Sequence, residues 1–420
     1  MSGERRGLAL ALLVMLAGAG EPAALSAQDD PALARARRLL ASTPLIDGHN
    51  DLVWEIRTSP TAPRDVAAYD LRATTPGQTD LARLRSGQVA AQFWSIYVPG
   101  EMRDSGYARI QLEEFDLARR MIARYPDRLA LALSADDIER EFKRGRVASL
   151  LGMEGGHVLE NSLGTLRVYY DLGARYLTLT HNVTLDWADA AADSARHGGL
   201  TEFGREVVRE MNRLGMLVDL SHVSPGTMSD ALDVTEAPVI FSHSSARALT
   251  EHVRNVPDSI LTRLKKNGGV VMVTFVGAFV SQPVADWEAR YGHELALAQA
   301  VSADTASHMR EWEQANPRPP ATLAQVADHL DHVRQVAGPD HVGIGSDFDG
   351  FDHPPVGLED VSRFPYLFAE LIRRGWSDDD LRKLAGRNLL RVLRQAEATA
   401  TRLRREREPS TRTIEQLDRP

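Results

Sequence analysis

The chain has 420 residues, no cysteine and a formal net charge of −9. The absence of cysteine excludes disulfide bonds, thiolate metal sites and a cysteine nucleophile, so any metal has to be held by histidine and carboxylate side chains. The excess of acidic residues argues against a surface that binds nucleic acid, because phosphate recognition needs a basic face.

A hydrophobic segment near the N-terminus is typical of an export signal. Arg5 and Arg6 precede an apolar run at residues 7–17, which is short for a membrane span, and small residues follow near Ala27. We therefore predict a signal peptide at residues 1–27 and a periplasmic or extracellular location, with no stable membrane insertion after cleavage. An N-terminal anchor that is not cleaved is the alternative.

Eight short apolar segments follow, and helical patterns lie between most of them. This alternation predicts an α/β fold, a (β/α)8 TIM-type barrel over residues 28–400. A doubly wound open sheet is the alternative, but no Gly-rich phosphate loop follows the first segment. The predicted strands are residues 44–51, 89–98, 147–156, 176–182, 216–222, 238–245, 269–276 and 341–350.

Two further segments stand apart from the repeated pattern. The connection at residues 287–322, before the last strand, is long enough to act as a lid or a dimer contact. The end of the chain, residues 401–420, is charged and has no apolar face, so we expect a disordered tail.

Ionisable side chains stand at the carboxyl ends of six of the eight segments, where barrel enzymes keep their chemistry. One such histidine would usually be structural, but so many buried ionisable groups need a common partner, and a cation is the simplest one. Histidine and carboxylate ligands without sulfur suit Zn²⁺, with Mn²⁺, Co²⁺ and Fe²⁺ as competitors, and more than four ligands favour two ions. The residues are His49, Asp51, Glu154, His181, His222, His243 and Asp347.

Several motifs of the chain, in their order, resemble the membrane dipeptidase family, peptidase family M19, within the amidohydrolase superfamily. The resemblance covers residues 45–393, nearly all of the chain after the predicted signal peptide. The motifs are LIDGHND (45–51), QFWS (92–95), GMEGGH (152–157), RYLTLTHN (175–182), DLSHVS (219–224), PVIFSHSSAR (238–247), RNVPD (254–258) and GIGSDFDG (343–350).

The resemblance implies a set of metal ligands. In this family pattern, His49 and Asp51 bind one zinc ion and His222 and His243 bind the other. Glu154 bridges the two ions, which agrees with the absence of a lysine from the fourth predicted strand, where other members of the superfamily carry a modified lysine.

The resemblance also implies a substrate and a mechanism. The expected enzyme is a zinc-dependent dipeptidase that hydrolyses free dipeptides, including those with a C-terminal D-residue, by a hydroxide that bridges the metals. His181 would face the scissile carbonyl, Arg254 would bind the terminal carboxylate, and Asp347 would act as acid and base. The expected partners are therefore small dipeptides, and the family commonly forms homodimers.

Other functions remain open at this point. One is another amidohydrolase activity, such as deacylation of N-acyl amino acids or hydrolysis of a β-lactam, and Val276 lies where mammalian members carry a pocket tyrosine. A non-catalytic binding protein is a third class, although every expected site position is present. The remaining histidines favour structural roles: His157 as a packing residue, and His329 and His332 on a solvated helix face.

Overall fold

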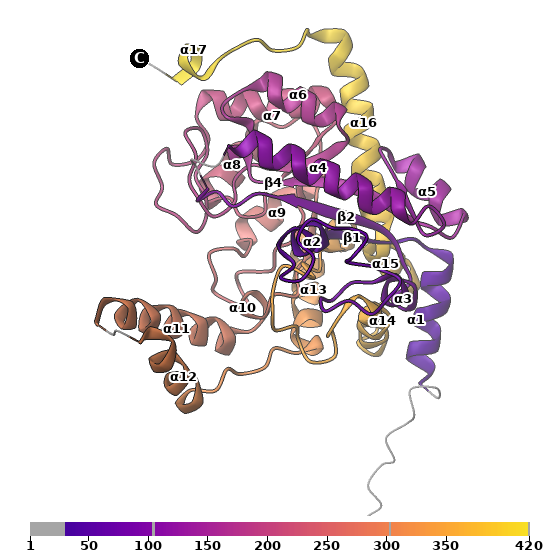
Figure 1. The fold of residues 1–420 in the computed structure, drawn as a ribbon. Helices are drawn as coiled ribbons and strands as arrows, with labels where there is room; N and C mark the ends of the chain where they lie inside the picture. The colour runs from indigo at the N-terminus through magenta and orange to yellow at the C-terminus, as the bar shows by residue number, and fades with distance from the viewer. Residues whose placement is uncertain (1–29, 103–105, 302–303, 419–420) are drawn as a thin grey trace, which may run out of the picture.

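The computed structural model describes residues 30–102, 106–301 and 304–418, so the predicted signal peptide at residues 1–27 lies outside the described residues. Eight parallel strands form a closed barrel, and helices surround it (Figure 1). The prediction of a (β/α)8 barrel is therefore confirmed. The strands are β1 (Leu45–Asn50), β2 (Val89–Tyr97), β3 (Leu129–Leu131), β4 (Val147–Glu154), β5 (Ala174–Thr178), β6 (Leu217–Asp219), β7 (Ile240–Phe241), β8 (Val270–Val273) and β9 (Val342–Ile344).

The barrel closes because β2 pairs with both β1 and β4. The ring then runs through β5, β6, β7 and β8 to β9, which returns to β1. The short strand β3 was not predicted. It pairs with the first residues of β4, and β5 pairs with the later residues of β4. Each of the eight predicted segments contains or overlaps one strand of the ring.

Helices lie between the strands as expected, and short helical turns, labelled η, occur in some of the connections. They are α1 (Pro31–Ser42), α2 (Leu52–Thr58), α3 (Leu81–Ser86), α4 (Tyr107–Arg124), α5 (Ala135–Lys143), η2 (Gly156–Leu159), α6 (Leu163–Asp171), α7 (Glu202–Leu214), α8 (Pro225–Val234), α9 (Asp258–Asn267), α10 (Gly277–Val280), α11 (Gln282–Val301), α12 (Thr305–Ala315), α13 (Leu323–Ala337), η3 (Pro339–His341), η4 (Val361–Arg363), α14 (Phe364–Arg373), α15 (Asp378–Arg382), η5 (Lys383–Arg387), α16 (Asn388–Glu406) and α17 (Ile414–Asp418).

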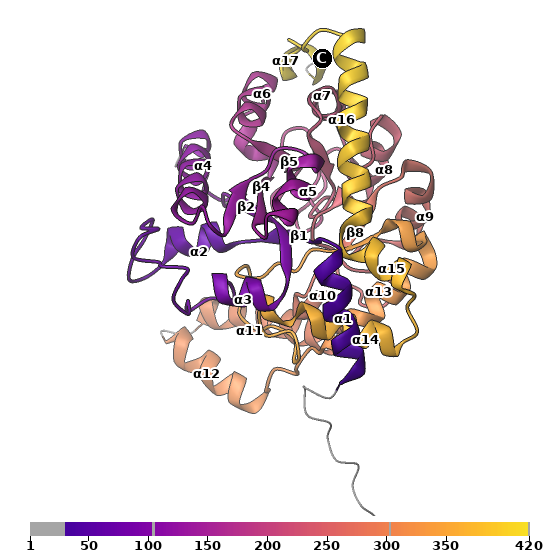
Figure 2. The ribbon, with the colours of Figure 1, turned by 90° about the vertical axis from the view of Figure 1, so that its right-hand side faces the viewer.

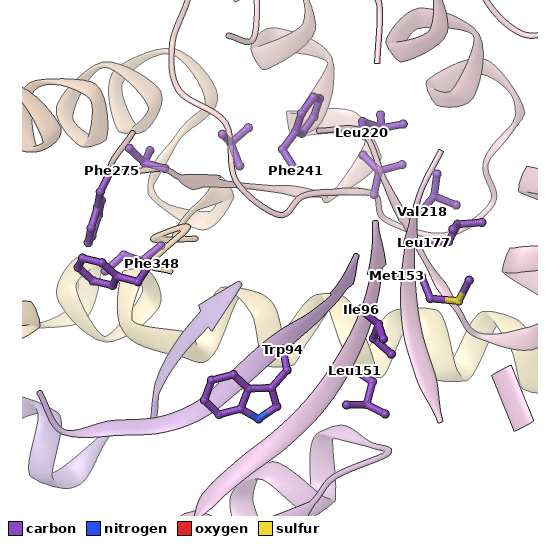
Figure 3. Close-up of a cluster of buried hydrophobic side chains, with 14 of the residues drawn as sticks. Trp94, Ile96, Leu151, Met153, Leu177, Val218, Leu220, Phe241, Phe275 and Phe348 are labelled. Carbon is purple, nitrogen blue, oxygen red and sulfur yellow. The ribbon is translucent and has the colours of Figure 1, made fainter. Parts of the chain in front are cut away.

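Two hydrophobic clusters hold the barrel together. The larger one lies between the strands and the helices, and Figure 3 shows side chains such as Trp94 of β2, Leu151 of β4 and Phe241 of β7 that contribute to it. The smaller cluster includes Phe93 and Met272 and fills the space around the other faces of the same strands. Burial of these apolar surfaces is the main stabilising contribution to the fold.

The turn η5, which leads directly into α16, packs against the amino-terminal end of the barrel. A Cβ on Gly386 would lie 2.4 Å from the carbonyl oxygen of Pro44, so only glycine permits this approach. Figure 2 shows α16 running from this end along the outside of the molecule. The opposite end of the barrel, where the strands finish, is left for the functional site.

The expectation of a disordered tail at residues 401–420 is wrong for the part of it that the structure describes. Helix α16 continues to Glu406, and α17 follows. The Asp418 carboxylate accepts hydrogen bonds from Thr201 Oγ1 (2.6 Å) and the Phe203 amide (3.1 Å), so it caps the start of α7. Apolar side chains also hold the tail: Leu403 is fully buried, and Ile414 and Leu417 pack against the larger hydrophobic cluster. These few apolar residues are spread among charged ones, so the composition did not reveal the contacts.

Helices α11 and α12 form an arm that projects from the body of the molecule (Figure 1). The rings of Trp287, Tyr291 and Trp312 pack on one another with centroids 5.2–5.8 Å apart and hold the two helices together. The arm begins directly after α10, at the carboxyl end of the barrel. In the described ranges, none of the helices combines the length and apolar character that crossing a membrane requires.

Candidate metal centre

A cavity of about 950 Å³ opens at the carboxyl ends of the barrel strands, and all seven ionisable strand-end residues predicted from the sequence lie in or beside it. The strands are shorter than the sequence suggested. His49 and Glu154 lie at the ends of β1 and β4, whereas the other five site residues follow their strands on loops; Asp51, for example, stands at the start of α2. The barrel supports these loops from below.

One half of the cluster forms around His49. Its Nε2 lies 3.2 Å from Asp51 Oδ2, 3.5 Å from Glu154 Oε2 and 3.8 Å from Asp347 Oδ1. Although these oxygens surround it, Nε2 is buried and has no hydrogen bond within the described chain. Its lone pair or proton therefore faces a set of carboxylates.

The other half of the cluster forms around the second oxygen of Glu154. Oε1 lies 3.0 Å from His222 Nε2 and 3.3 Å from His243 Nε2, and the two ring nitrogens are 2.8 Å apart. Glu154 thus presents one carboxylate oxygen to each half. This is the geometry that a bridging carboxylate requires.

Each of the three histidines is held from behind through its Nδ1 atom. His49 Nδ1 lies 2.9 Å from the hydroxyl of Tyr176, His222 Nδ1 lies 3.1 Å from Asn182 Oδ1, and His243 Nδ1 lies 2.8 Å from Ser242 Oγ. Metal-binding histidines commonly have such a partner at the nitrogen that does not bind the ion. All three Nε2 atoms are left to face the cluster.

Two buried aspartates tie the loops of the site to each other. Asp47 accepts hydrogen bonds from the amide (2.7 Å) and hydroxyl (2.6 Å) of Ser346, and Asp219 accepts the equivalent pair from Ser242 (2.8 and 2.6 Å). Each serine directly precedes a site residue. The two contacts therefore fix the positions of Asp347 and His243.

The backbone at the site departs from ordinary conformations. His222, Asp347 and Asp349 have φ angles of 68°, 69° and 65°, in the left-handed region that residues with a side chain rarely adopt. Such conformations cost of order 1 kcal/mol or more each, and they persist where the surroundings fix them. They direct these side chains into the cavity.

The electrostatics of Glu154, His222 and His243 favour the protonation states that bind cations, whereas the pKa of His49 is raised well above the histidine norm because the lowering effect of burial is outweighed by Tyr176, Glu154 and Asp51. Burial alone would raise the pKa of Glu154, but the imidazoles of His49, His222 and His243 together hold that pKa well below its usual value. Burial lowers the pKa values of His222 and His243 well below the histidine norm. Glu154 is therefore ionised and these two histidines are neutral, as ligands must be.

The chemistry and spacing of these donors fit divalent cations. Three groups of potential ligands have their donor atoms within 4.8 Å of one another: His49, Asp51 and Glu154; Glu154, His222 and His243; and His49, His243 and Asp347. An unpartnered buried nitrogen and two ring nitrogens in contact are unfavourable arrangements unless a cation lies between them. Nitrogen and oxygen donors without sulfur suit zinc.

Arg254 lies on the wall of the same cavity and is only 4% exposed. Its Nη2 donates to His243 Nε2 (2.8 Å), while Nε and Nη1 have no hydrogen-bond partner among the described residues. Burial lowers its pKa to about 10, which leaves the guanidinium charged at neutral pH. A buried cation with two free donors that lines a cavity is suited to an anionic ligand.

His181 and Asp347 lie on two sides of the cluster. His181 Nε2 is 3.9 Å from Glu154 Oε1, and burial lowers the pKa of this imidazole, so it is neutral. Burial raises the pKa of Asp347 well above its ordinary value, so this carboxyl can hold a proton. One neutral donor and one proton carrier therefore face the same space.

The sequence did not single out several residues that shape the site. Trp54, Tyr97 and Phe279 line the cavity as aromatic walls, and Tyr176 and Ser242 support the histidines from behind. Tyr176 precedes Thr178 by two positions on a predicted strand, so alternation along that strand could have placed its side chain inside the barrel. The other supports come together only through the fold.

The histidines assigned structural roles are placed as follows. His157 is buried and its Nε2 contacts the carbonyl oxygen of Val98 (2.8 Å), outside the cluster. His329 is fully buried rather than solvated, and its Nδ1 accepts from the Ala246 amide (3.1 Å). The expectation of a solvated helix face is therefore wrong for His329, because the loop after β7 covers it.

A (β/α)8 barrel with a buried histidine and carboxylate cluster at its carboxyl end defines a metal-dependent hydrolase. The comparison with known proteins specifies which kind. The family model described as "Membrane dipeptidase (Peptidase family M19)" matches residues 33–407, and the chain belongs to this family. It is accordingly a metallo-dipeptidase, and the resemblance seen in the sequence is confirmed.

The chain is similar to named relatives across most of its length. It is 43% identical to Dipeptidase 3 of Mus musculus over 374 residues, which are 88% of this chain and 68% of that protein. The crystal structure of the probable dipeptidase PvdM from Pseudomonas aeruginosa has a TM-score of 0.76 and 26% identity, covering 88% of this chain and 99% of that one. A metallopeptidase from Rhodobacter sphaeroides, solved with a phosphinate mimic of the dipeptide L-Ala-D-Ala, has a TM-score of 0.69 and 25% identity, covering 84% and 99%.

Proposed function

We propose that this protein is a zinc-dependent dipeptidase that hydrolyses free dipeptides, including those with a C-terminal D-residue, at a centre of two ions. His49 and Asp51 would hold one ion, His222 and His243 the other, and Glu154 would join them. Two zinc ions there would supply a water of lowered pKa and an electrophile for the carbonyl oxygen. The bound dipeptide mimic in the Rhodobacter sphaeroides relative supports the substrate class.

The observation that carries this proposal is the buried guanidinium of Arg254 on the wall of the cavity that holds the cluster. Its free Nε and Nη1 donors and its positive charge are available to bind the terminal carboxylate of the substrate. Because Arg254 and the candidate metal ligands line one cavity, the peptide bond nearest the carboxylate is the one held for cleavage. Longer peptides would place a backbone amide, without charge, against the guanidinium.

His181 and Asp347 supply the remaining functions. The neutral imidazole of His181 donates a hydrogen bond to the oxygen on which negative charge develops. Asp347 accepts a proton on its carboxylate from the attacking water and passes it to the leaving amine. Burial raises the pKa of Asp347, which favours its protonated form once it has taken up that proton.

The test is hydrolysis of a panel of L-Xaa-L-Yaa and L-Xaa-D-Yaa dipeptides by the purified chain, with and without a chelator. Each dipeptide is paired with its C-terminal amide and with its N-acetyl form. Chelator-sensitive cleavage that is lost on amidation is the expected result. Cleavage of the N-acetyl forms alone would instead indicate a deacylase.

A substitution of Arg254 distinguishes a dipeptidase from the alternative activities. Arg254→Met removes the charged contact to the carboxylate, so we expect KM for free dipeptides to rise and the preference over amides to disappear. The protein can be tested in the same way with a β-lactam that carries a carboxylate. If Arg254→Met loses that activity to the same extent as its dipeptidase activity, Arg254 recognises the carboxylate rather than the peptide.

We also propose that the chain is exported, with residues 1–27 as a cleaved signal peptide, and that it forms a homodimer. N-terminal sequencing of the protein recovered from a cell envelope fraction tests the first statement. The mass in solution by light scattering tests the second. A chain that retains its first residues and partitions with membranes would support the uncleaved anchor.

A further inference from the structure

The carboxylate of Asp219, at the end of β6, receives four hydrogen bonds beneath the candidate metal centre. Oδ1 accepts from the amides of Ser221 (3.1 Å) and Ser242 (2.8 Å), and Oδ2 accepts from the hydroxyls of Ser242 (2.6 Å) and Thr178 (2.5 Å). These residues are all completely buried. The two backbone groups can only donate, so they fix which oxygen faces the two hydroxyls.

The hydroxyl of Ser242 connects this carboxylate to a proposed metal ligand. Ser242 Oγ lies 2.6 Å from Asp219 Oδ2 and 2.8 Å from His243 Nδ1. A hydroxyl has one proton, and here it is donated to the carboxylate. Ser242 can then only accept from the imidazole, which places the ring proton of His243 on Nδ1.

The other side of the same ring leads to the same assignment. Arg254 Nη2 lies 2.8 Å from His243 Nε2, and a guanidinium can only donate. His243 Nε2 is therefore an acceptor and carries its lone pair towards the cavity. A ligand to a metal ion needs that lone pair on that atom.

We propose that Asp219, acting through Ser242, is a positioning residue that keeps the proton of His243 on Nδ1 and so presents Nε2 to the metal centre. The inference rests on the proposed metal centre and adds to it a group that does not itself touch metal or substrate. The equivalent supports of His49 and His222, which are Tyr176 and Asn182, are single neutral side chains. Only His243 is supported through a serine by a buried carboxylate.

Asp219→Asn tests the proposal because it reverses the direction of the hydrogen bonds that connect residue 219 to His243 through Ser242. The amide oxygen has to take the Oδ1 position, where the Ser221 and Ser242 amides donate. The NH₂ group then takes the Oδ2 position and donates to Ser242 Oγ. The hydroxyl of Ser242 is left to donate to His243 Nδ1, which requires the ring proton to leave that nitrogen.

Two measurements follow the effect. Nitrogen-15 NMR of the metal-free protein, labelled at histidine and assigned with a His243→Gln variant, reports which ring nitrogen carries the proton. Competition with a chromophoric chelator gives the zinc affinity of the full-length mature protein. We expect the Nδ1 proton of His243 to be lost in Asp219→Asn and the affinity for the more weakly bound zinc to fall about 10- to 100-fold.

Thr178→Val is the matched control. It removes the other hydroxyl that donates to Asp219 Oδ2 and keeps the shape of the side chain, but it does not contact His243. We expect a lower melting temperature with an unchanged His243 signal and unchanged zinc affinity. Ser242→Ala provides a second variant that leaves Asp219 intact, and Ser242→Thr, which retains a hydroxyl, should restore most of the affinity that Ser242→Ala loses.

The proposal is overturned if Asp219→Asn and Ser242→Ala keep the parent's zinc affinity, or if Thr178→Val lowers that affinity as much as they do. Neither readout requires turnover. If the protein cleaves no dipeptide but the variants show these effects, the proposed substrate class is wrong and the role of Asp219 still stands. A chain that binds no zinc at all would instead disprove the metal centre of the proposed function.

Discussion

Gly152 of β4 and Tyr176 of β5 approach each other so closely that a Cβ on Gly152 would lie 2.0 Å from Cζ of the tyrosine ring. The same ring directs its hydroxyl to His49 Nδ1, 2.9 Å away. A glycine with no chemistry of its own therefore sets the position of a proposed metal ligand two contacts away. This relationship gives the first prediction.

Gly152→Ala should displace the ring of Tyr176 and with it the support of His49. We expect a loss of about 1–3 kcal/mol in the free energy of unfolding, since the interior is already filled, together with weaker zinc binding. Urea unfolding and chelator competition measure the two effects. Gly292→Ala, where a Cβ would meet no atom within 4 Å, is the control and should lose neither.

Removal of Arg57 should destabilise the contact between α2 and α4. Its Nη1 donates to Oε1 of the fully buried Glu114 (2.9 Å), whose pKa burial raises to about 8. Without the guanidinium, Glu114 has to take up a proton or remain charged in the core. We expect Arg57→Met to lower the free energy of unfolding by about 3 kcal/mol in urea titrations at pH 8.

The double variant Arg57→Met with Glu114→Gln is the control, because it removes the charge that the single variant leaves unpaired. It should recover most of the lost stability. Trp54, on the same short helix α2, lines the cavity, so the single variant should also raise KM more than it lowers kcat. Equal stability of the single variant and the parent would contradict the interpretation.

Replacement of His181 should slow the chemical step without removing metal. The imidazole faces the cavity beside Glu154 but belongs to none of the three close ligand groups. If it donates to the developing oxyanion, His181→Ala should lower kcat about 100- to 1000-fold with little change in KM. Zinc content measured on the same sample should match the parent; a variant that loses zinc would make His181 a ligand instead.

The buried His329 should make stability depend on pH. Burial lowers its pKa to about 4, against an ordinary value of 6.5, so between these values the unfolded chain binds a proton that the folded chain does not. Stability therefore falls as the pH falls from 6.5 towards 4, by about 2 kcal/mol at pH 5. His329→Asn, which keeps an acceptor for the Ala246 amide, should show a smaller difference between urea titrations at pH 7 and pH 5.

Removal of metal should lower thermal stability, because ions that bind only the folded state stabilise it by mass action. We expect the melting temperature to fall after dialysis against a chelator and to recover with added zinc. Two equivalents per chain should be needed. Recovery that is complete at one equivalent would contradict the pair of ions, and unchanged melting would contradict the centre itself.

The barrel was predictable because its strands are buried on both faces and leave apolar segments of four to eight residues. The ends of the strands were not. Ile240 and Phe241 alone make β7, although the predicted segment runs over 238–245, because Ser242 and the residues after it turn to hydrogen-bond with Asp219 and Ser221. The local sequence cannot show where hydrogen bonds to side chains replace the backbone hydrogen bonds between strands.

The same limit applies to the site. His49 and Glu154 could be proposed from the chain because strand ends converge at one side of a barrel. Strand alternation could have placed the Tyr176 side chain inside the barrel, but the roles of Tyr176 and Ser242 as supports of histidines depend on residues that only the closed ring brings into contact. The sequence thus indicates which groups carry the chemistry, while the groups that orient them emerge from packing.

The contact between Asp47 and Ser346 joins residues 299 positions apart. Contacts of such separation form late, because the chain entropy of closing a long loop must be overcome first. A nascent chain that ends before Ser346 already contains His49 and Asp51 but cannot fasten their loop to the last strand. We therefore expect the centre to assemble only after the last strand is in place, so an incomplete chain released from the ribosome would carry several of the ligands of a hydrolase without its activity.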